Sequence, residues 1–220
     1  MSFELTARDR LVVVGKTGYG KSRWVKTLCA ELQARGRRIV VFDPCDEYSV
    51  QGRETDETEL GPLRQRMTAR ELYRNPQALD ARTLSLALVP DRDDPQDVAR
   101  DFERCAELVR ATGGVVFVVE EVGYFAEHCA SKLKAAATVY RKDGVAVVFV
   151  SQRAVQVPLT ARSQASTIIA FHQDEPQDLA ALDERCGRAL PDIADKLPRL
   201  RVGECVTWRD LPPNLKGHTP

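Results

Sequence analysis

The chain has 220 residues, 43% of them hydrophobic, which suits one domain of ordinary size with a substantial core. Its 32 basic residues balance 32 acidic ones, so no overall charge marks a nucleic-acid binder and any basic surface has to be local. The six cysteines form no C-x-x-C pair, the amino terminus lacks the apolar core of a signal peptide, and no apolar run approaches the ~20 residues of a membrane span. We therefore expect a cytoplasmic protein without a zinc site or a transmembrane segment.

Short β-branched runs alternate with helical patterns along the chain. The expected strands are LVVV at 11–14, IVVF at 39–42, LSLALV at 84–89, VVFVV at 115–119, VAVVFV at 145–150 and TIIAF at 167–171. The expected helices cover about 21–35, 95–112, 129–142 and 175–186. Most apolar runs are continuous, as in strands that are covered on both faces. The alternation predicts an α/β domain with a mainly parallel central sheet flanked by helices.

Two segments depart from this alternation. Residues 50–82 are polar and weakly periodic, and we interpret them as a possible insertion with a short helix near 63–74. LRVGECVTW at 200–208 alternates around Gly203 and predicts a hairpin or an edge strand.

The segment GKTGYGKS at 15–22 matches the phosphate-loop pattern G-x-x-x-x-G-K-[ST]. It follows the first strand directly and opens the first helix, which is the setting that phosphate binding needs. Lys21 would reach the β- and γ-phosphates, and the Ser22 hydroxyl would bind Mg²⁺. No N-K-x-D motif of a GTPase is present, which favours ATP. The residues expected to bind the nucleotide are Gly15, Lys16, Thr17, Gly18, Tyr19, Gly20, Lys21, Ser22 and Arg23.

Two adjacent glutamates end the apolar strand in VVFVVEEVG at 115–123. A phosphate-loop enzyme needs an acidic group at such a strand end to hold Mg²⁺ and to polarise water. We assign Glu120 to the Mg²⁺ shell, through water, and Glu121 to the base that orients or deprotonates the attacking water. The usual order is an aspartate followed by a glutamate, and Glu120 departs from it. The alternative is a strand end with two solvated glutamates.

A third polar strand end is found in VAVVFVSQR at 145–153. If this strand neighbours the acidic one, Gln152 would lie near the γ-phosphate and could sense hydrolysis. Arg141 and Lys142 precede the strand, so they would lie at its opposite end or on the preceding helix. They are either surface charges or, for Arg141, an arginine finger that reaches the nucleotide of a neighbouring subunit.

Together, GKTGYGKS, FDPCDEY, VVEEVG, RKDGVAVVFVSQR and STIIAFH resemble the FtsK/HerA superfamily of ring ATPases over about residues 8–207. The resemblance implies that Arg141 is the arginine acting in trans and Gln152 the sensor. It implies that Asp43 and Glu47 lie near the nucleotide or at a subunit edge, although Asp43 fits a strand-ending turn equally well. Arg153 is either a second phosphate contact or a subunit contact.

The resemblance also implies a single RecA-like motor domain over residues 1–208, and the sequence of the segment at 209–220 predicts an irregular tail. The size of the chain and its lack of further domains are most similar to the genome-packaging ATPases of tailless, internal-membrane double-stranded DNA viruses. Such a protein would form a hexameric ring, hold DNA by sequence-independent phosphate contacts, meet capsid or portal-vertex proteins, and act in the host cytoplasm or at the virion vertex. Candidate channel residues, which could equally form an exposed basic helix face, are Arg64, Arg66, Arg70 and Arg74.

Three other functions fit parts of the pattern. A morphogenesis or secretion ATPase of the zonula occludens toxin type would usually carry a transmembrane segment. A small-molecule kinase would need a lid with arginines, and none is clear in the sequence. A nucleotide-binding switch would use the same loop without motor activity.

Overall fold

The computed structural model describes residues 5–49 and 63–210, whose eight strands form one sheet in the order β3-β4-β2-β5-β6-β1-β7-β8. The strands are β1 (Arg10–Val14), β2 (Ile39–Phe42), β3 (Gln65–Thr68), β4 (Ser85–Val89), β5 (Val116–Val119), β6 (Ala146–Ser151), β7 (Thr167–Ala170) and β8 (Val206–Arg209). Every neighbouring pair is parallel except β7 and β8. The mainly parallel α/β sheet is confirmed, and so is an edge strand near the carboxyl end.

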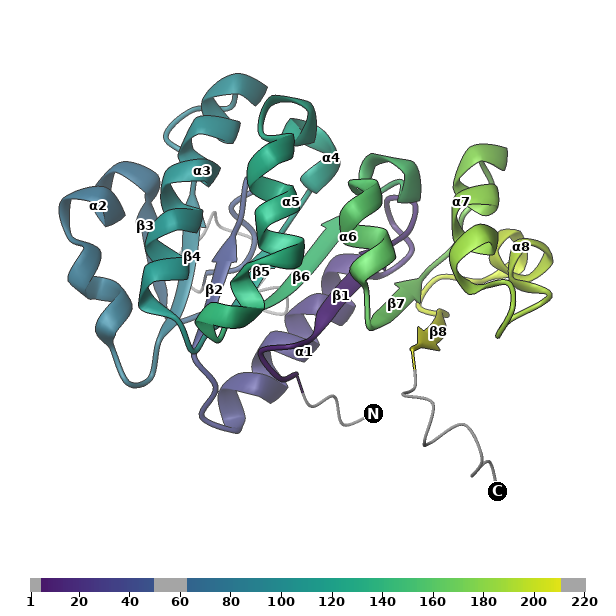
Figure 1. Cartoon of the computed structure of the whole chain (residues 1–220), viewed down its shortest axis with the longest axis horizontal. Helices are drawn as coiled ribbons and strands as arrows, with labels where there is room; N and C mark the ends of the chain where they lie inside the picture. Colours follow the sequence, from purple (N-terminus) through teal and green to yellow (C-terminus); the bar gives the residue numbers. More distant parts are fainter. Residues whose placement is uncertain (1–4, 50–62, 211–220) are drawn as a thin grey trace.

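Helices cover both faces of this sheet (Figure 1). They are α1 (Lys21–Ala34), α2 (Ala69–Arg74), α3 (Pro95–Thr112), α4 (Val122–Phe125), α5 (Ala130–Thr138), α6 (Leu159–Gln164), α7 (Pro176–Cys186) and α8 (Ile193–Lys196). Alternate residues of β1 belong to two different cores: Val12 and Val14 share one with α3 and α5, whereas Leu11 and Val13 share the other with α1. This two-sided burial explains why the strands read as continuous apolar runs.

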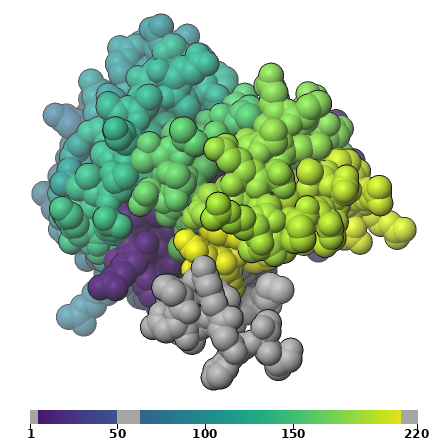
Figure 2. Space-filling model, turned by 45° about the vertical axis from the view of Figure 1, so that its right-hand side comes forward, coloured from purple at the N-terminus to yellow at the C-terminus, as the bar shows by residue number. Residues whose placement is uncertain are grey.

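The sheet has α2 near one end and α7 and α8 near the other (Figure 1). In Figure 2 the carboxy-terminal part of the chain, coloured yellow-green to yellow, lies on one side of the molecule. The phosphate-loop strand β1 lies between β6 and β7, and the acidic strand β5 lies on the far side of β6. Since these strands are parallel, their carboxyl ends lie together on one side of the sheet, at the ends of the strands.

The helix predicted near 63–74 is wrong in its first half. Residues 65–68 form β3, which pairs with β4, and α2 begins only at Ala69. A capping box fixes this start: the Thr68 hydroxyl accepts the Glu71 N–H, and the Glu71 carboxylate accepts the Thr68 N–H. Arg64 and Arg66 therefore do not share a helix face with Arg70 and Arg74.

Other boundaries differ by a few residues. The helix expected at 129–142 is α5, which ends at Thr138 and is followed by a 3₁₀ turn, η4 (Tyr140–Asp143). Short helices α4, α6 and α8 were not predicted, because four to six residues give no periodic pattern. Arg209 belongs to β8, so the predicted tail would start after it. Residues 50–62 and 211–220 lie outside the described part, and the division into motor domain, insertion and tail stays a prediction.

Candidate nucleotide site

The phosphate loop connects the carboxyl end of β1 to α1 and is held by both neighbouring strands. The Gly15 N–H donates to the Ser151 carbonyl at 3.3 Å, at the end of β6. The Lys16 N–H donates to the His172 carbonyl at 3.0 Å, just after β7. These bonds place the loop at the carboxyl ends of the strands, where the polar residues that follow β5 and β6 also lie.

Each glycine of the motif has its own steric reason. Gly18 and Gly20 have φ angles of +84° and +98°, which side chains rarely adopt. At Gly15 a Cβ atom would lie 2.5 Å from the Cβ of Phe171, so the loop packs against the chain with no room for a side chain. The pattern of glycines thus follows from the backbone path of the loop.

A pocket of about 390 Å³ opens beside this loop, within the size range of ligand sites. Its lining comes from the loop and α1, from the segment after β2, and from the ends of β5 and β6. The lining residues are Thr17, Gly18, Gly20, Lys21, Ser22, Arg23, Asp43, Cys45, Glu47, Tyr48, Glu120, Glu121 and Gln152. The fold therefore collects residues more than a hundred positions apart in one cavity.

Two residues of the predicted phosphate loop face elsewhere. The Lys16 ammonium pairs with Asp174 at 2.7 Å, and this contact raises the pKa of Lys16 and lowers that of Asp174. The Tyr19 ring stacks on the His172 ring with centroids 4.2 Å apart. Both side chains fasten the loop to the segment after β7, which leaves only their backbone for a nucleotide.

Lys21 is the first residue of α1, and its side chain is only 5% exposed. Its Nζ lies 3.7 Å from Oε1 of Glu121. The helix has no side-chain cap at Gly20, so its first N–H groups remain available to an anion. A buried cation beside an uncapped helix start is an arrangement that attracts phosphate.

Glu120 follows β5 and is buried, with 3% exposure. Its N–H donates to the Phe42 carbonyl of β2 at 3.0 Å, and its Oε1 accepts the Tyr48 hydroxyl. Burial raises the pKa of Glu120 to about 7, although the Tyr48 hydrogen bond and the nearby Lys21 act in the opposite direction.

Glu121 has a left-handed backbone, with φ 46° and ψ 44°, at the start of α4. For a residue with a side chain this conformation costs of order 1–3 kcal/mol, and such residues gather at functional sites. The strand thus ends at an abrupt turn. The side chain of Glu121 lies beside Lys21, whereas Glu120 remains packed under Tyr48.

Asp43 follows β2 and is fully buried. Its Oδ2 accepts the N–H groups of Glu47 at 2.8 Å and Tyr48 at 2.9 Å, whereas Oδ1 has no hydrogen-bond partner. Burial raises the pKa of Asp43 to about 6. The sequence fits Asp43 equally well to a strand-ending turn and to a position near the nucleotide or at a subunit edge. In the structure it stabilises the turn after β2 and lines the pocket.

Gln152 and Arg153 follow β6, which lies between β1 and β5. Gln152 is exposed and lines the pocket, and its carbonyl accepts the side-chain amide of Gln173 at 2.9 Å. The guanidinium of Arg153 pairs with the buried carboxylate of Asp178 in α7 at 2.9 Å. Within one chain, therefore, Arg153 is an internal tie to α7 and not a phosphate contact.

Arg141 lies on η4, exposed, at the amino end of β6. The phosphate loop lies at the carboxyl end of the sheet, so the six residues of β6 separate the two by about 20 Å. The turn is fixed by the buried Tyr140 ring and by an ion pair between Asp143 and Arg110 at 2.8 Å. Arg141 therefore cannot reach the pocket of its own chain.

A family model described as "Helicase HerA, central domain" matches residues 6–160, which is more than half of the chain. The chain belongs to this HerA family. Its phosphate loop, acidic strand end and Gln152 all fall within the matched residues. It is thus a P-loop ATPase of the HerA/FtsK type. No curated protein matches the chain.

Solved structures share the fold of this HerA-family chain at low sequence identity. The genome packaging NTPase B204 from Sulfolobus turreted icosahedral virus 2, in complex with ATP-gammaS, has a TM-score of 0.68 at 18% identity, covering 92% of this chain and 93% of that one. The bacterial conjugative coupling protein TrwB has a TM-score of 0.60 at 13% identity, covering 92% and 82%. VirB4 of Thermoanaerobacter pseudethanolicus has a TM-score of 0.55 at 14% identity, covering 93% and 90%.

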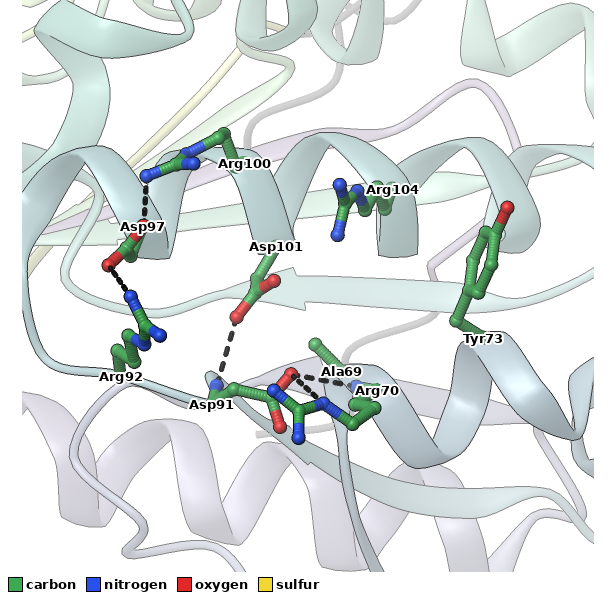
Figure 3. A pocket seen from close by; sticks show the side chains of 9 residues that line it. All are labelled: Ala69, Arg70, Tyr73, Asp91, Arg92, Asp97, Arg100, Asp101 and Arg104. Atoms are coloured by element: carbon green, nitrogen blue, oxygen red, sulfur yellow. Dashed lines mark hydrogen bonds and ion pairs between the residues drawn. The ribbon is translucent and has the colours of Figure 1, made fainter.

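A second pocket of the HerA-family chain lies between α2, the loop after β4, and α3 (Figure 3). Four arginines line it together with Tyr73: Arg70, Arg92, Arg100 and Arg104. Asp97 pairs with Arg92 and Arg100, and Asp91 with Arg70. Of the predicted channel residues only Arg70 lines this pocket, and Arg66 instead pairs with Asp46 at 2.8 Å.

Among the described residues no helix is long and apolar enough to span a bilayer.

Sequence reasoning did not single out Tyr48, Asp178 or the arginines that follow β4. Tyr48 lies within the quoted FDPCDEY segment, so its position after a strand was available as a signal. Asp178 and Arg92 carry no such signal, because ordinary surface segments contain similar residues.

Proposed function

We propose that this chain assembles into a ring and uses the hydrolysis of ATP to translocate double-stranded DNA. The observation that carries the proposal is the gathering of Lys21, Glu120, Glu121 and Gln152 around one pocket at the phosphate loop. A buried cation for phosphate, two carboxylates and an amide are the parts that hydrolysis of a triphosphate requires.

The pocket fits a nucleotide with Mg²⁺. Ser22 and Glu120 line it together, and they would hold the metal ion, Glu120 through water. Among the described residues no three His, Cys, Asp or Glu side chains are grouped closely enough to hold a metal ion by themselves. When bound, Mg²⁺ neutralises charge on the phosphates.

The residues of the chain divide the chemistry among them. Lys21 and the first N–H groups of α1 hold the terminal phosphates. Glu121 accepts the proton of the attacking water, since it reaches into the pocket beside Lys21. Gln152, an exposed residue that lines the same pocket, senses whether the γ-phosphate is present.

A neighbouring subunit completes the site in this proposal. Arg141 is exposed at the edge of the sheet opposite the loop, where it can enter the pocket of the next subunit but not its own. A head-to-tail arrangement of this kind closes into a ring, and we propose a hexamer. The structurally similar B204 is a genome packaging NTPase, and this likeness supports a packaging role at a capsid or portal vertex.

DNA would be held through its phosphates. Arg70, Arg92 and Arg100 have side-chain exposures of 63%, 73% and 64% on one surface of the chain. Their carboxylate partners position the guanidinium groups without covering them (Figure 3). Contacts of this type are independent of sequence and weaken with salt.

A second candidate is DNA transfer in conjugation or secretion. It is favoured by the similarity of the fold to the coupling protein TrwB and to VirB4. The active-site chemistry would be the same, and only the partner complex would differ.

The experiment is ATP hydrolysis with and without double-stranded DNA, with the assembly state measured in the same samples. We expect hydrolysis that DNA stimulates and that appears with a ring-sized particle. Phosphate transfer to a small metabolite without a response to DNA would instead identify a kinase, and full activity from a monomer would exclude the ring.

A further inference from the structure

The oxygen Oδ1 of Asp43 is a buried polar atom without a hydrogen-bond partner, at the edge of the nucleotide pocket. Leaving a buried carboxylate oxygen unpaired is costly, and native structures rarely do so without a reason. The other oxygen, Oδ2, is fully engaged by the N–H groups of Glu47 and Tyr48. Oδ1 is therefore the oxygen that remains for a bound group.

Glu120 stands next to Asp43 on the neighbouring strand. The register pairs Phe42 with Val119, so the residues that follow them, Asp43 and Glu120, lie side by side at the end of the sheet. Tyr48 connects the two: its N–H donates to Asp43 and its hydroxyl donates to Oε1 of Glu120. Each carboxylate thus has one oxygen fixed by the segment after β2, and Oδ1 of Asp43 remains unpaired.

The acidic side chains around Asp43 and Glu120 outnumber the basic ones, which favours the binding of a cation. Among the described residues that line the pocket, four are acidic, Asp43, Glu47, Glu120 and Glu121, and two are basic, Lys21 and Arg23. Asp43 and Glu120 are the two most deeply buried of these acids. A hydrated divalent ion offers several water hydrogens, which are the donors that two adjacent carboxylate oxygens can accept.

We propose that Asp43 is a second carboxylate of the metal's outer shell, accepting a hydrogen bond from metal-bound water at Oδ1 beside Glu120. Tyr48 is the positioning residue that holds both carboxylates in place. The inference rests on the proposed nucleotide function and adds to it a residue that directly follows β2. It also gives the segment after β2 a direct part in recognising the metal–nucleotide complex.

The test uses the full chain, ATPγS and MgCl₂. Asp43→Asn keeps a carbonyl oxygen for the N–H groups of Glu47 and Tyr48 but removes the acceptor at the other position. The affinity for ATPγS is measured with Mg²⁺ and with EDTA, and the ratio of the two gives the contribution of the metal. We expect Asp43→Asn to lower that ratio about 10- to 100-fold, as outer-shell substitutions do, with an affinity in EDTA close to that of the unchanged chain.

Asp46→Asn is the matched control. Asp46 belongs to the same turn and is the same residue type, but its carboxylate pairs with Arg66. For Asp46→Asn, the ratio of the ATPγS affinities with Mg²⁺ and with EDTA should equal that of the unchanged chain. An Asp43→Asn ratio equal to that of Asp46→Asn would overturn the inference, whether both are normal or both are lowered. Failure of the unchanged chain to bind ATPγS at all would instead refute the proposed function.

Discussion

The ammonium group of Lys21 lies 3.7 Å from the carboxylate of Glu121. The residue that would grip the γ-phosphate is thus in contact with the residue that would activate water. Both side chains are largely shielded, at 5% and 21% exposure, so their attraction is only weakly screened by solvent. A bound phosphate would draw Lys21 toward itself and leave Glu121 free to accept a proton.

Glu121→Gln should bind ATP at least as well as the unchanged chain and hydrolyse it about 10²–10⁴-fold more slowly. The amide keeps the shape of the side chain but cannot accept the proton of water. It also no longer competes with phosphate for Lys21. Equilibrium binding of ATP and single-turnover hydrolysis measure the two effects. Lys21→Ala, in contrast, should lose binding, and normal turnover by Glu121→Gln would show that the assignment of the base is wrong.

Arg141→Ala should retain ATP binding and lose about 10³-fold in hydrolysis, because the arginine serves the next subunit. The decisive measurement mixes Arg141→Ala with Lys21→Ala subunits. Each variant supplies the half of the site that the other lacks, so the mixture should be more active than either variant alone. Lys142→Ala, which changes the adjacent exposed cation, is the control and should behave like the unchanged chain. A mixture no better than its components would refute the trans arrangement.

Replacing Arg70, Arg92 and Arg100 with alanine should remove the stimulation of hydrolysis by DNA and leave basal hydrolysis intact. Each lost phosphate contact should reduce the slope of log affinity against log salt concentration by about 1. DNA binding at several salt concentrations measures that slope. Arg199→Ala is a suitable comparison, since Arg199 is exposed in the segment after α8, near the other end of the sheet from α2 (Figure 1). An unchanged salt slope in the triple variant would place the DNA elsewhere.

Without ligand, the free energy of unfolding should fall as pH rises from about 4.5 to about 7. The pKa of Glu120 is raised by burial from 4.5 to about 7, so the folded chain holds a proton that the unfolded chain has released across this range. Asp43, with its pKa raised to about 6, adds to the same trend. Chemical denaturation at several pH values measures it. Glu120→Gln should flatten the decline, and the same change at the exposed Glu127 should not.

The residues that line the candidate site could largely be singled out from local sequence patterns. The spacing GKTGYGKS and the acidic and amide ends of two apolar runs are local features, because the glycine backbone angles and the buried strands depend on neighbouring residues. The alternation of strands and helices likewise predicted a mainly parallel sheet.

How these parts meet depends on the tertiary structure. Because β6 lies between β1 and β5, Gln152 at its carboxyl end lines the pocket, and Arg141 lies near its amino end, away from the pocket. Burial of Asp178 ties Arg153 to α7, and burial of Asp43 leaves one of its oxygens unpaired. Pairing with β4 makes residues 65–68 a strand, against their polar pattern. The reason is common to all four: strand order and burial depend on contacts between residues far apart in the chain, which no local pattern encodes.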